Sequence, residues 1–281
     1  IYRVLYPFFD RKFIADSYSC RVGKGTHKAL NRFRTFAYKV SKNHTRTCWV
    51  LKCDIRKFFA NIDHTILMQV LRKNIEDQEI VLLLENIIGS FQTPVTAPPF
   101  AGRASPKVMG GSTRSSPGDG SRVVARDDRK DWIAAASTPR NDRRVGLPLG
   151  NLTSQLLVNI YMNEFDQWVK HTLKAKHYIR YADDFILLYY SKAELEQTLP
   201  KIADFLHERL RLKLHPDKTF IQTFASGVDF LGWVHFADHR VLRTASKKRM
   251  FRRLKEKRTE GSVASYRGML GHGNTQKLLG K

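Results

Sequence analysis

Three stretches of the chain differ in how apolar and polar residues alternate. Residues 1–91 and 146–258 show regular helical or strand-like spacing of apolar positions, whereas residues 92–145 do not. The irregular stretch of 54 residues (145 − 92 + 1) holds 6 of the 10 prolines, together with runs of Gly and Ser. Such a composition buries too little apolar surface to offset the entropy of the chain. We therefore predict a disordered insertion over residues 92–145.

A short strand is predicted within the first regular stretch. Residues 49–55 are rich in strand-forming residues and alternate in polarity. Because successive side chains of a strand point to opposite faces, Leu51 and Cys53 would face a core. Lys52 and Asp54 would lie on the other face, with Asp54 projecting from the end of the strand.

Capping signals mark the starts of three amphipathic helices. Asp63 can cap one helix, and Asn151 or Thr153 can cap a second, since apolar residues at helical spacing follow each of them. Ser191 followed by Glu194 forms a capping box for a third helix.

Two further helical features are expected. A fourth, largely apolar helix is predicted over residues 79–88. Pro200 lies inside the helix that follows Ser191, where it should kink that helix or reset its start.

A β-hairpin with acidic residues at its tip is predicted in the second regular stretch. The strand-like runs 178–181 and 185–189 flank Ala182-Asp183-Asp184. Further strands are expected over residues 218–223 and 228–234. This order of strands and helices predicts a small antiparallel sheet backed by helices, an α+β fold.

The charge of the chain indicates a polyanionic partner. Lys and Arg number 49 against 26 Asp and Glu, a net charge of +23. Such an excess concentrates nucleic acid around a protein. A merely basic soluble protein and an anionic membrane surface are the alternatives. No apolar run approaches the roughly 20 residues that span a bilayer, so membrane insertion is not expected.

The cysteines give no sign of a disulfide framework or of a zinc site. There are three, Cys20, Cys48 and Cys53, and none forms a C-x-x-C pair. An odd number without framework spacing suggests reduced thiols inside a cell. We expect a cytoplasmic location.

The acidic pair Asp183-Asp184 differs from an ordinary surface pair. Asp127-Asp128 stands between arginines in a polar stretch and is typical of a solvated turn. Asp183-Asp184 lies between two apolar, strand-like runs, where adjacent negative charges are costly unless cations compensate them. Two divalent ions held by carboxylates could promote nucleotidyl transfer if Asp54 lay nearby, but its 129-residue separation from Asp183 (183 − 54) leaves that contact open.

Five collinear motifs resemble those of reverse transcriptases. Tyr181-Ala182-Asp183-Asp184 resembles the family's Tyr-x-Asp-Asp box, and residues 54–59 resemble its first carboxylate motif, Asp-x-x-x-Phe-Phe. Residues 146–155 look like its template-handling loop and helix, residues 215–219 like the lysine motif, and residues 230–233 like the primer grip. The order of all five is that of the family.

The resemblance implies a right-hand polymerase. Residues 1–91 would be partial fingers and the first part of the palm, 146–243 the remaining palm, and 244–281 the start of a short helical thumb. The family's basic fingers hairpin would precede Ile1. Magnesium or manganese, as two ions, an RNA template, a DNA or RNA primer and dNTPs are implied as cofactor and partners, with a basic accessory protein of a retroelement as a further partner.

The resemblance also assigns roles to individual residues. Metal binding is carried over to Asp54, Asp183, Asp184 and the backbone carbonyl of Ile55, and catalysis to the three acids and Lys218. Contact with the incoming dNTP is carried over to Phe58, Phe59, Leu149 and Gly150, with Phe59 excluding a 2′-hydroxyl. Contact with template or primer is carried over to Asn151, Ser154, Gln155, Tyr181, Leu231, Gly232 and Trp233. The ordinary alternatives are a core aromatic for Phe59, a solvated residue for Lys218 and a glycine bulge for Gly232.

Departures from the common pattern point to a subtype. Leu149 stands where many relatives carry Gln, which resembles the enzymes of diversity-generating retroelements. Residues 16–18 and 23–27 look similar to an early motif of the same group. The resemblance implies error-prone copying of template adenines. Retron or group II intron-type enzymes, maturases and a non-catalytic RNA-binding remnant are the other interpretations.

A basic helix is expected downstream of the motifs. Its cations are interleaved with Met250, Phe251 and Leu254, so that it could follow a phosphate backbone, although a solvated charged face is the alternative. The cations are Lys247, Lys248, Arg249, Arg252, Arg253, Lys255, Lys257 and Arg258.

Overall fold

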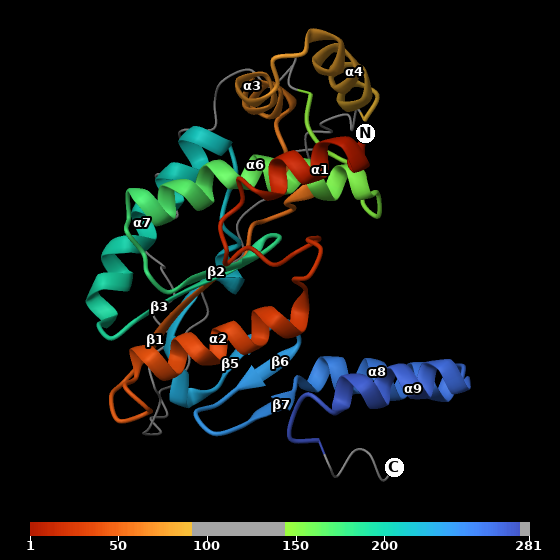
Figure 1. Cartoon of the computed structure of the whole chain (residues 1–281). Coiled ribbons are helices and arrows are strands. Elements are labelled where there is room, and N and C mark those ends of the chain that lie inside the picture. Colours follow the sequence, from red (N-terminus) through yellow and green to blue (C-terminus); the bar gives the residue numbers. More distant parts are fainter. Residues whose placement is uncertain (92–143, 276–281) are drawn as a thin grey trace, which may run out of the picture.

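A computed structural model describes residues 1–91 and 144–275. Helices surround a central sheet, and a second small sheet leads to the two C-terminal helices (Figure 1). The helices are α1 Tyr2–Asp10, α2 Thr26–Val40, α3 His64–Asn74, α4 Gln78–Gly89, α6 Leu152–His171, α7 Lys192–Leu210, α8 Thr244–Glu256 and α9 Glu260–Leu270. The strands are β1 Trp49–Cys53, β2 Tyr178–Tyr181, β3 Asp184–Tyr189, β4 Phe220–Thr223, β5 Val228–Phe230, β6 Trp233–His235 and β7 Arg240–Leu242.

The central sheet joins segments that lie far apart in the sequence. Its strand order is β2-β3-β1-β4, and each neighbouring pair is antiparallel. β1 pairs with β3 in a register that sets Cys53 opposite Phe185. Asp54 therefore leaves β1 next to Asp184, the first residue of β3. The predicted antiparallel sheet backed by helices is confirmed.

Both faces of the central sheet are covered. Leu51 and Phe185 belong to a core with α3, α6 and α7, while Val50 belongs to a second core with α2 and the small sheet. Lys52 and Asp54 alternate onto the face of Val50, as predicted. They are only 8% and 9% exposed, so this polar face is enclosed by the second layer.

The single strand predicted over residues 228–234 is wrong, because the chain reverses within it. β5 and β6 are antiparallel, with Phe230 opposite Trp233. Leu231 and Gly232 between them have φ values of 49° and 85°. A two-residue turn with two positive φ angles matches the twist of the flanking strands. Gly232 adopts this conformation without the steric cost that a side chain imposes on Leu231.

The prediction that Pro200 resets the start of α7 is also wrong. The helix begins at Lys192 and continues past Pro200. Ser191 caps its start, since the Ser191 hydroxyl accepts a hydrogen bond from the N–H of Glu194 at 3.5 Å. Proline inside a helix costs about 3 kcal/mol, but each buried apolar side chain contributes roughly 1.5–3 kcal/mol. The buried apolar side chains of α7 are Leu195, Ile202, Leu206 and Leu210.

The other predicted helix starts are confirmed. The Asp63 carboxylate accepts a hydrogen bond from the N–H of Ile66 at 3.2 Å and caps α3, while it also binds Arg211 at 2.8 Å. The Asn151 side chain accepts one from the N–H of Thr153 at 2.8 Å and caps α6. α4 covers the helix predicted over residues 79–88.

The chain enters and leaves the predicted insertion at one place. Of residues 92–145, only the last two lie within the described residues. Val145 forms an isolated bridge with Asp63, and the carbonyl of Arg144 accepts a hydrogen bond from the N–H of His64 at 3.1 Å. The guanidinium of Arg144 also lies 3.8 Å from where a Cβ on Gly89 would stand. The chain thus returns beside the start of α3 and the end of α4.

Three smaller expectations can be compared with the structure. All three cysteines are free, as predicted, and burial raises the pKa of the Cys48 thiol to about 12. α8 begins at Thr244, where the start of a thumb was expected. Among helices of the described residues, none combines the length and the apolar character that crossing a membrane requires.

A histidine is buried in the second core. His235 on β6 is 1% exposed, lies edge-on to Phe33 at 5.0 Å, and its Nε2 has no hydrogen-bond partner among the described residues. Burial, reinforced by the charges of Arg240 and Arg34, lowers the pKa of His235 to about 3. The core between α2 and the small sheet therefore holds this ring uncharged.

This burial predicts a loss of stability in acid. Because the pKa of His235 is about 3 when folded and 6.5 as the ordinary value, the unfolded chain binds the proton first as the pH falls. The free energy of unfolding should fall by about 1.4 kcal/mol per pH unit from this group between those values. In urea titrations, His235→Phe should show a shallower acid dependence than the wild type. The exposed control His171→Asn should follow the wild type, and a parallel fall in all three would contradict this prediction.

Candidate active site

The β2–β3 hairpin carries its acidic tip to one end of the central sheet. Tyr181 ends β2 and pairs with Asp184, so Ala182 and Asp183 form a two-residue turn. Ala182 is in the left-handed region, with φ of 54°. The predicted hairpin is confirmed, and Asp184 belongs to its strand rather than to its turn.

Asp54 reaches the same end of the sheet from the neighbouring strand. Its carbonyl accepts a hydrogen bond from the N–H of His215 at 2.7 Å. Ile55, which is 1% exposed, forms an isolated bridge with Leu214. The backbone on both sides of the Asp54 side chain is therefore fixed between β3 and the segment that precedes β4.

The three carboxyl groups influence one another. Burial is the largest cause that raises the pKa of Asp183, and the charge of Asp54 raises it further. The pKa of Asp184 is raised to about 6, chiefly by burial, with the charges of Asp54 and Asp183 adding to the effect and Lys52 opposing it. Ionising all three groups thus needs compensating positive charge.

Two lysines supply part of that charge. Nζ of Lys218 donates to both carboxylate oxygens of Asp54, at 3.2 and 3.1 Å. Nζ of Lys52 lies 3.8 Å from Oδ1 of Asp184. Lys52 was not among the predicted site residues, although strand alternation already set it on the face of Asp54. Its burial beside an acid cluster is the feature that identifies it.

The carboxylates offer the right chemistry for a divalent ion. Within residues 1–91 and 144–275, no three His, Cys, Asp or Glu side chains are grouped as a metal-binding set. The charge of the acids is partly balanced by Lys52 and Lys218 instead. However, Oδ1 of Asp184 is buried and accepts no hydrogen bond from any described residue. Carboxylate oxygens, one of them unsatisfied at Asp184, are the type of ligand that a hard cation such as Mg²⁺ prefers.

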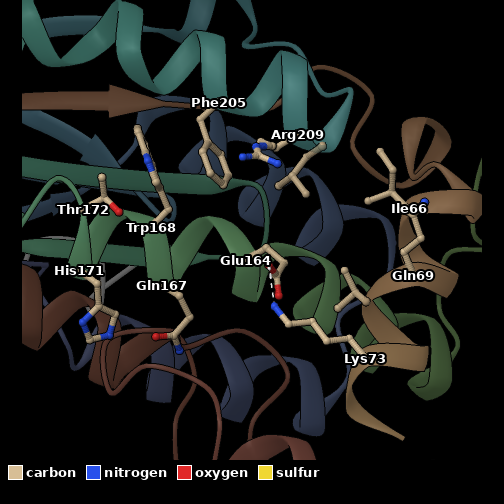
Figure 2. A pocket seen from close by; sticks show the side chains of 12 residues that line it. Ile66, Gln69, Lys73, Glu164, Gln167, Trp168, His171, Thr172, Phe205 and Arg209 are labelled. Carbon is tan, nitrogen blue, oxygen red and sulfur yellow. Dashed lines mark ion pairs between the residues drawn. The ribbon is translucent and has the colours of Figure 1, made fainter.

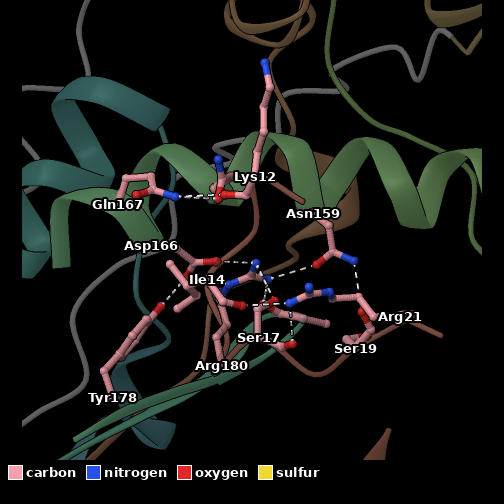
Figure 3. A network of polar contacts seen from close by, with 12 residues as sticks. Lys12, Ile14, Ser17, Ser19, Arg21, Asn159, Asp166, Gln167, Tyr178 and Arg180 are labelled. Carbon is pink, nitrogen blue, oxygen red and sulfur yellow. Dashed lines mark hydrogen bonds and ion pairs between the residues drawn. The ribbon is translucent and has the colours of Figure 1, made fainter. Parts of the chain in front are cut away.

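A fully buried arginine supports the acidic turn from the opposite face of the sheet. Arg180 donates from Nε and Nη2 to the two oxygens of Asp166 on α6, at 2.8 and 2.7 Å, and both side chains are 0% exposed. Nη1 donates to the carbonyl of Ala182 at 3.0 Å. Figure 3 shows Arg180 at the centre of this network. The carbonyl of the turn is thereby tied to α6.

Further partners complete the network around Arg180. The hydroxyl of Tyr178 donates to Asp166 at 2.7 Å, and Arg180 also donates to Asn159 at 3.2 Å and to Ser17 at 3.1 Å (Figure 3). The early segment with the motif resemblance therefore lies against β2, where Ser17 forms a parallel bridge with Arg180. Sequence reasoning missed Arg180 because nothing in its spacing indicates a partner on α6.

The predicted dNTP-contacting residues lie in different environments. Phe58 is 3% exposed and belongs to the first core, where the ring of Phe59 packs edge-on against it at 5.5 Å. Phe59 is half-buried at the margin of that core. Leu149 is 76% exposed, and Gly150 has φ of 85° in the turn before α6.

The predicted template and primer residues are also dispersed. Ser154 is fully buried, Gln155 is half-buried on α6, and Asn151 serves as the cap of that helix. The hydroxyl of Tyr181 accepts a hydrogen bond from Thr26 at 3.1 Å. Of the predicted primer-grip residues, Leu231 and Gly232 form the β5–β6 turn, while Trp233 is buried beneath the Arg240 guanidinium at 5.6 Å.

A cavity of about 540 Å³ lies away from the carboxylates, between α3, α6 and α7 (Figure 2). Trp168 and Phe205 stack there at 4.4 Å, and Lys73 pairs with Glu164 at 3.9 Å. It contains none of the predicted site residues. We assign it no part in the chemistry of the acidic end of the sheet.

Part of the chain matches a known protein family. Residues 132–235 match the family described as reverse transcriptase (RNA-dependent DNA polymerase). Over these residues the chain resembles the reverse transcriptase family. This matched region contains the acidic hairpin, α6, α7 and the β5–β6 turn.

Curated relatives extend the similarity over most of the chain. Protein YkfC of Escherichia coli strain K12 is 26% identical over 274 residues, which cover 86% of this chain and 58% of YkfC. The group II intron-encoded protein LtrA of Lactococcus lactis subsp. cremoris is 23% identical over 296 residues, covering 92% of this chain and 45% of LtrA. The chain thus spans about half the length of these relatives.

Solved structures support the fold. Telomerase from Candida albicans, in complex with a TWJ fragment of telomeric RNA, has a TM-score of 0.50 at 12% identity over 87% of this chain and 37% of its own. Apo telomerase from Candida tropicalis, truncated from its C-terminal domain, has a TM-score of 0.50 at 10% identity over 86% and 44%. The predicted α+β right-hand polymerase palm is confirmed.

Burial of the Arg180–Asp166 pair predicts that a single substitution of Asp166 lowers the free energy of unfolding strongly. Asp166→Asn would leave the Arg180 guanidinium buried without its counter-charge, and such a loss costs about 3–5 kcal/mol of unfolding free energy. Glu85→Gln is the matched control, because it removes the partner of Arg72 from an exposed pair with side chains 54% and 49% exposed. An exposed pair contributes less than about 1 kcal/mol. Urea unfolding followed by circular dichroism measures both, and equal losses would show that burial of Arg180 is unimportant.

Proposed function

We propose that the chain synthesises DNA on an RNA template by metal-dependent nucleotidyl transfer. The observation that carries the proposal is the meeting of Asp54 with Asp183 and Asp184 at the ends of adjacent antiparallel strands. The pKa values of Asp183 and Asp184 are raised, and lysines balance part of the charge of the acids. Such a group of acids would repel a polyanion unless cations lay between them. Binding RNA alone therefore gives no reason for this arrangement.

Asp54, Asp183 and Asp184, with the carbonyl of Ile55, would hold two Mg²⁺ or Mn²⁺ ions. When bound, such ions lower the pKa of a primer 3′-hydroxyl and stabilise the charge that develops on the leaving pyrophosphate. The side chains of Lys52 and Lys218 balance the acids from the protein side. Because Lys218 is the more exposed of the two, it is the better placed to meet the charge of a triphosphate.

Other side chains would orient the substrates. Phe59 would lie against the sugar of the incoming nucleotide and exclude a 2′-hydroxyl, with Phe58 behind it in the core. Leu149 and Gly150 would border the base, and Tyr181 with the Leu231-Gly232 turn would contact the primer. The remaining predicted contacts, Asn151, Ser154, Gln155 and Trp233, would act chiefly by shaping the elements around template and primer.

The charge of the chain supports an RNA template, a primer and dNTPs as partners. The net charge is +23, and α8 carries a run of exposed cations beyond the small sheet. Such cations bind phosphates without reading sequence. A basic accessory protein is part of the retroelement form of the proposal.

Primer extension tests the proposed chemistry. Asp183→Asn should lower extension of a primer on an RNA template with dNTPs and Mg²⁺ by at least about 100-fold, since metal ligation contributes several kcal/mol to the transition state. Asp204→Asn, which changes an exposed acid on α7, should leave extension unchanged. Chelation of Mg²⁺ should abolish synthesis by the wild type and by the control. Equal extension by Asp183→Asn and the wild type would refute the carboxylate assignment.

Two subtypes remain candidates within this chemistry. Similarity to LtrA and to a putative COX1/OXI3 intron 2 protein of Saccharomyces cerevisiae favours a group II intron-type enzyme with a maturase role. Leu149 in place of Gln favours the error-prone enzymes of diversity-generating retroelements. The two differ in fidelity at template adenines.

Fidelity distinguishes the subtypes. If Leu149 relaxes fidelity by removing an amide near the base, Leu149→Gln should reduce misincorporation opposite template adenine by about fivefold to tenfold, the effect of one hydrogen bond. The substitution should not affect folding, because Leu149 is 76% exposed. Sequencing of cDNA made on a defined RNA template measures the change. Ordinary fidelity at adenine in the wild type would exclude the diversity-generating subtype.

A further inference from the structure

A second cavity lies at the end of the central sheet that is remote from the carboxylates. It has a volume of about 370 Å³ and is formed by the end of α2, the loop before β2 and the end of β3. β3 runs from Asp184 at the acidic end to Tyr189 at the cavity. At about 3.3 Å per residue, the five steps from Asp184 to Tyr189 separate the two ends by roughly 17 Å.

The lining of this cavity is strongly basic. Five exposed cations surround it: Lys39, Lys42, Arg46, Lys174 and Lys176. Within the described part of the chain, none of the five forms an ion pair with an acid, and none donates a side-chain hydrogen bond. Burial lowers the pKa of His177 beside them, and the charges of Lys170, Lys39 and Lys176 lower it further. Five cations without counter-charges in one hollow form an anion-binding surface.

The turn that presents two of these cations is unusual. Lys42, Asn43 and His44 are three consecutive residues with positive φ, at 47°, 61° and 65°. The hydroxyl of Ser41 accepts a hydrogen bond from the N–H of His44 at 2.9 Å and supports the turn. Lys174, on the other side of the cavity, also has positive φ, at 53°. Such strained backbone is retained where its surroundings require it, often where ligands bind.

The cavity also offers a surface for a base or sugar. Tyr190 is 68% exposed and Tyr189 is half-buried, while Val40 and Leu188 form an apolar floor. A hydrogen bond with Glu194 raises the pKa of Tyr190. Burial, followed by the charge of Glu194, raises the pKa of Tyr189. Cations beside an exposed aromatic ring are the combination that binds single-stranded nucleic acid.

We propose that this hollow, the distal basic pocket, binds the phosphates of an RNA segment that lies about 17 Å from the site of synthesis. The choice of RNA among polyanions rests on the proposed function. The pocket is too far from Asp183 and Asp184 to hold the triphosphate of an incoming nucleotide. It would instead hold a template or structured RNA on the chain while the primer end is copied.

A structural explanation accounts for only part of the pocket. Lys39 and Lys42 lie at the C-terminal end of α2, where cations interact favourably with the helix dipole. Lys174 and Lys176 lie before β2 and gain nothing from that dipole. Helix stabilisation and RNA binding therefore predict different results for a variant that changes one lysine on α2 and one in the loop before β2.

The test measures RNA affinity and its salt dependence in the full chain. Lys39→Gln/Lys176→Gln should bind a labelled RNA of about 40 nucleotides roughly tenfold more weakly at low salt. The slope of log affinity against log salt should fall by between about 1 and 2, as expected for two lost phosphate contacts. Lys201→Gln/Arg209→Gln on α7 removes the same charge from exposed positions and should keep the wild-type slope.

Further readings separate the possible outcomes. Unchanged RNA affinity, or an equal loss in the α7 control, would overturn the proposal. A lower melting temperature of the pocket variant without weaker RNA binding would also overturn the proposal, because Lys39 would then only stabilise its helix. The proposal would be overturned as well if the variant lost binding to anionic phospholipid vesicles but kept its binding to RNA. Extension of a short primer–template should be retained by the pocket variant. Absence of extension in every protein would instead reject the proposed function, while the binding comparison would still be readable.

Discussion

The fold depends most on the ion pair between Arg180 and Asp166. Both side chains are removed from water, and that desolvation is offset only because each of the two charged groups has several hydrogen-bond partners. The pair connects β2 to α6, reaches the N-terminal segment through Ser17, and fixes the carbonyl of Ala182. Three parts of the chain that share no sequence proximity are thereby oriented around one guanidinium.

Charged side chains on the two faces of the hairpin are compensated to different degrees. Arg180 and its partners face α6, whereas Asp184 and Lys52 face the layer that contains α2. The network on the first face uses opposite charges in full contact and is closed to solvent. The second face is only partly compensated, with one carboxylate oxygen of Asp184 unsatisfied. The rigid network around Arg180 thus supports, from one face, the carboxylates on the other face, whose negative charge is only partly compensated.

Local chemistry decided which features the sequence could predict. Strand alternation identified β1 and the hairpin, and the Asp63 and Asn151 caps located α3 and α6, because each signal acts within a few residues. The reversal at Leu231-Gly232 was missed because the flanking strands are too short to show a period. The contact of Asp54 with the hairpin depends on the strand register, and the Arg180–Asp166 pair on how β2 crosses α6. The assignment of a polymerase rested on motif resemblance, which also gave no indication of Lys52.

The paired ends of the chain beside α3 affect how the fold tolerates added length. His64 and Asp63 hold the returning segment at Arg144 and Val145, close to Gly89 where α4 ends. Because these two fixed points lie close together, connections of different length can join them without moving α3 or α4. A segment inserted between them would therefore lengthen the chain without changing the packing around the central sheet, so this junction is suited to the insertion of a reporter domain.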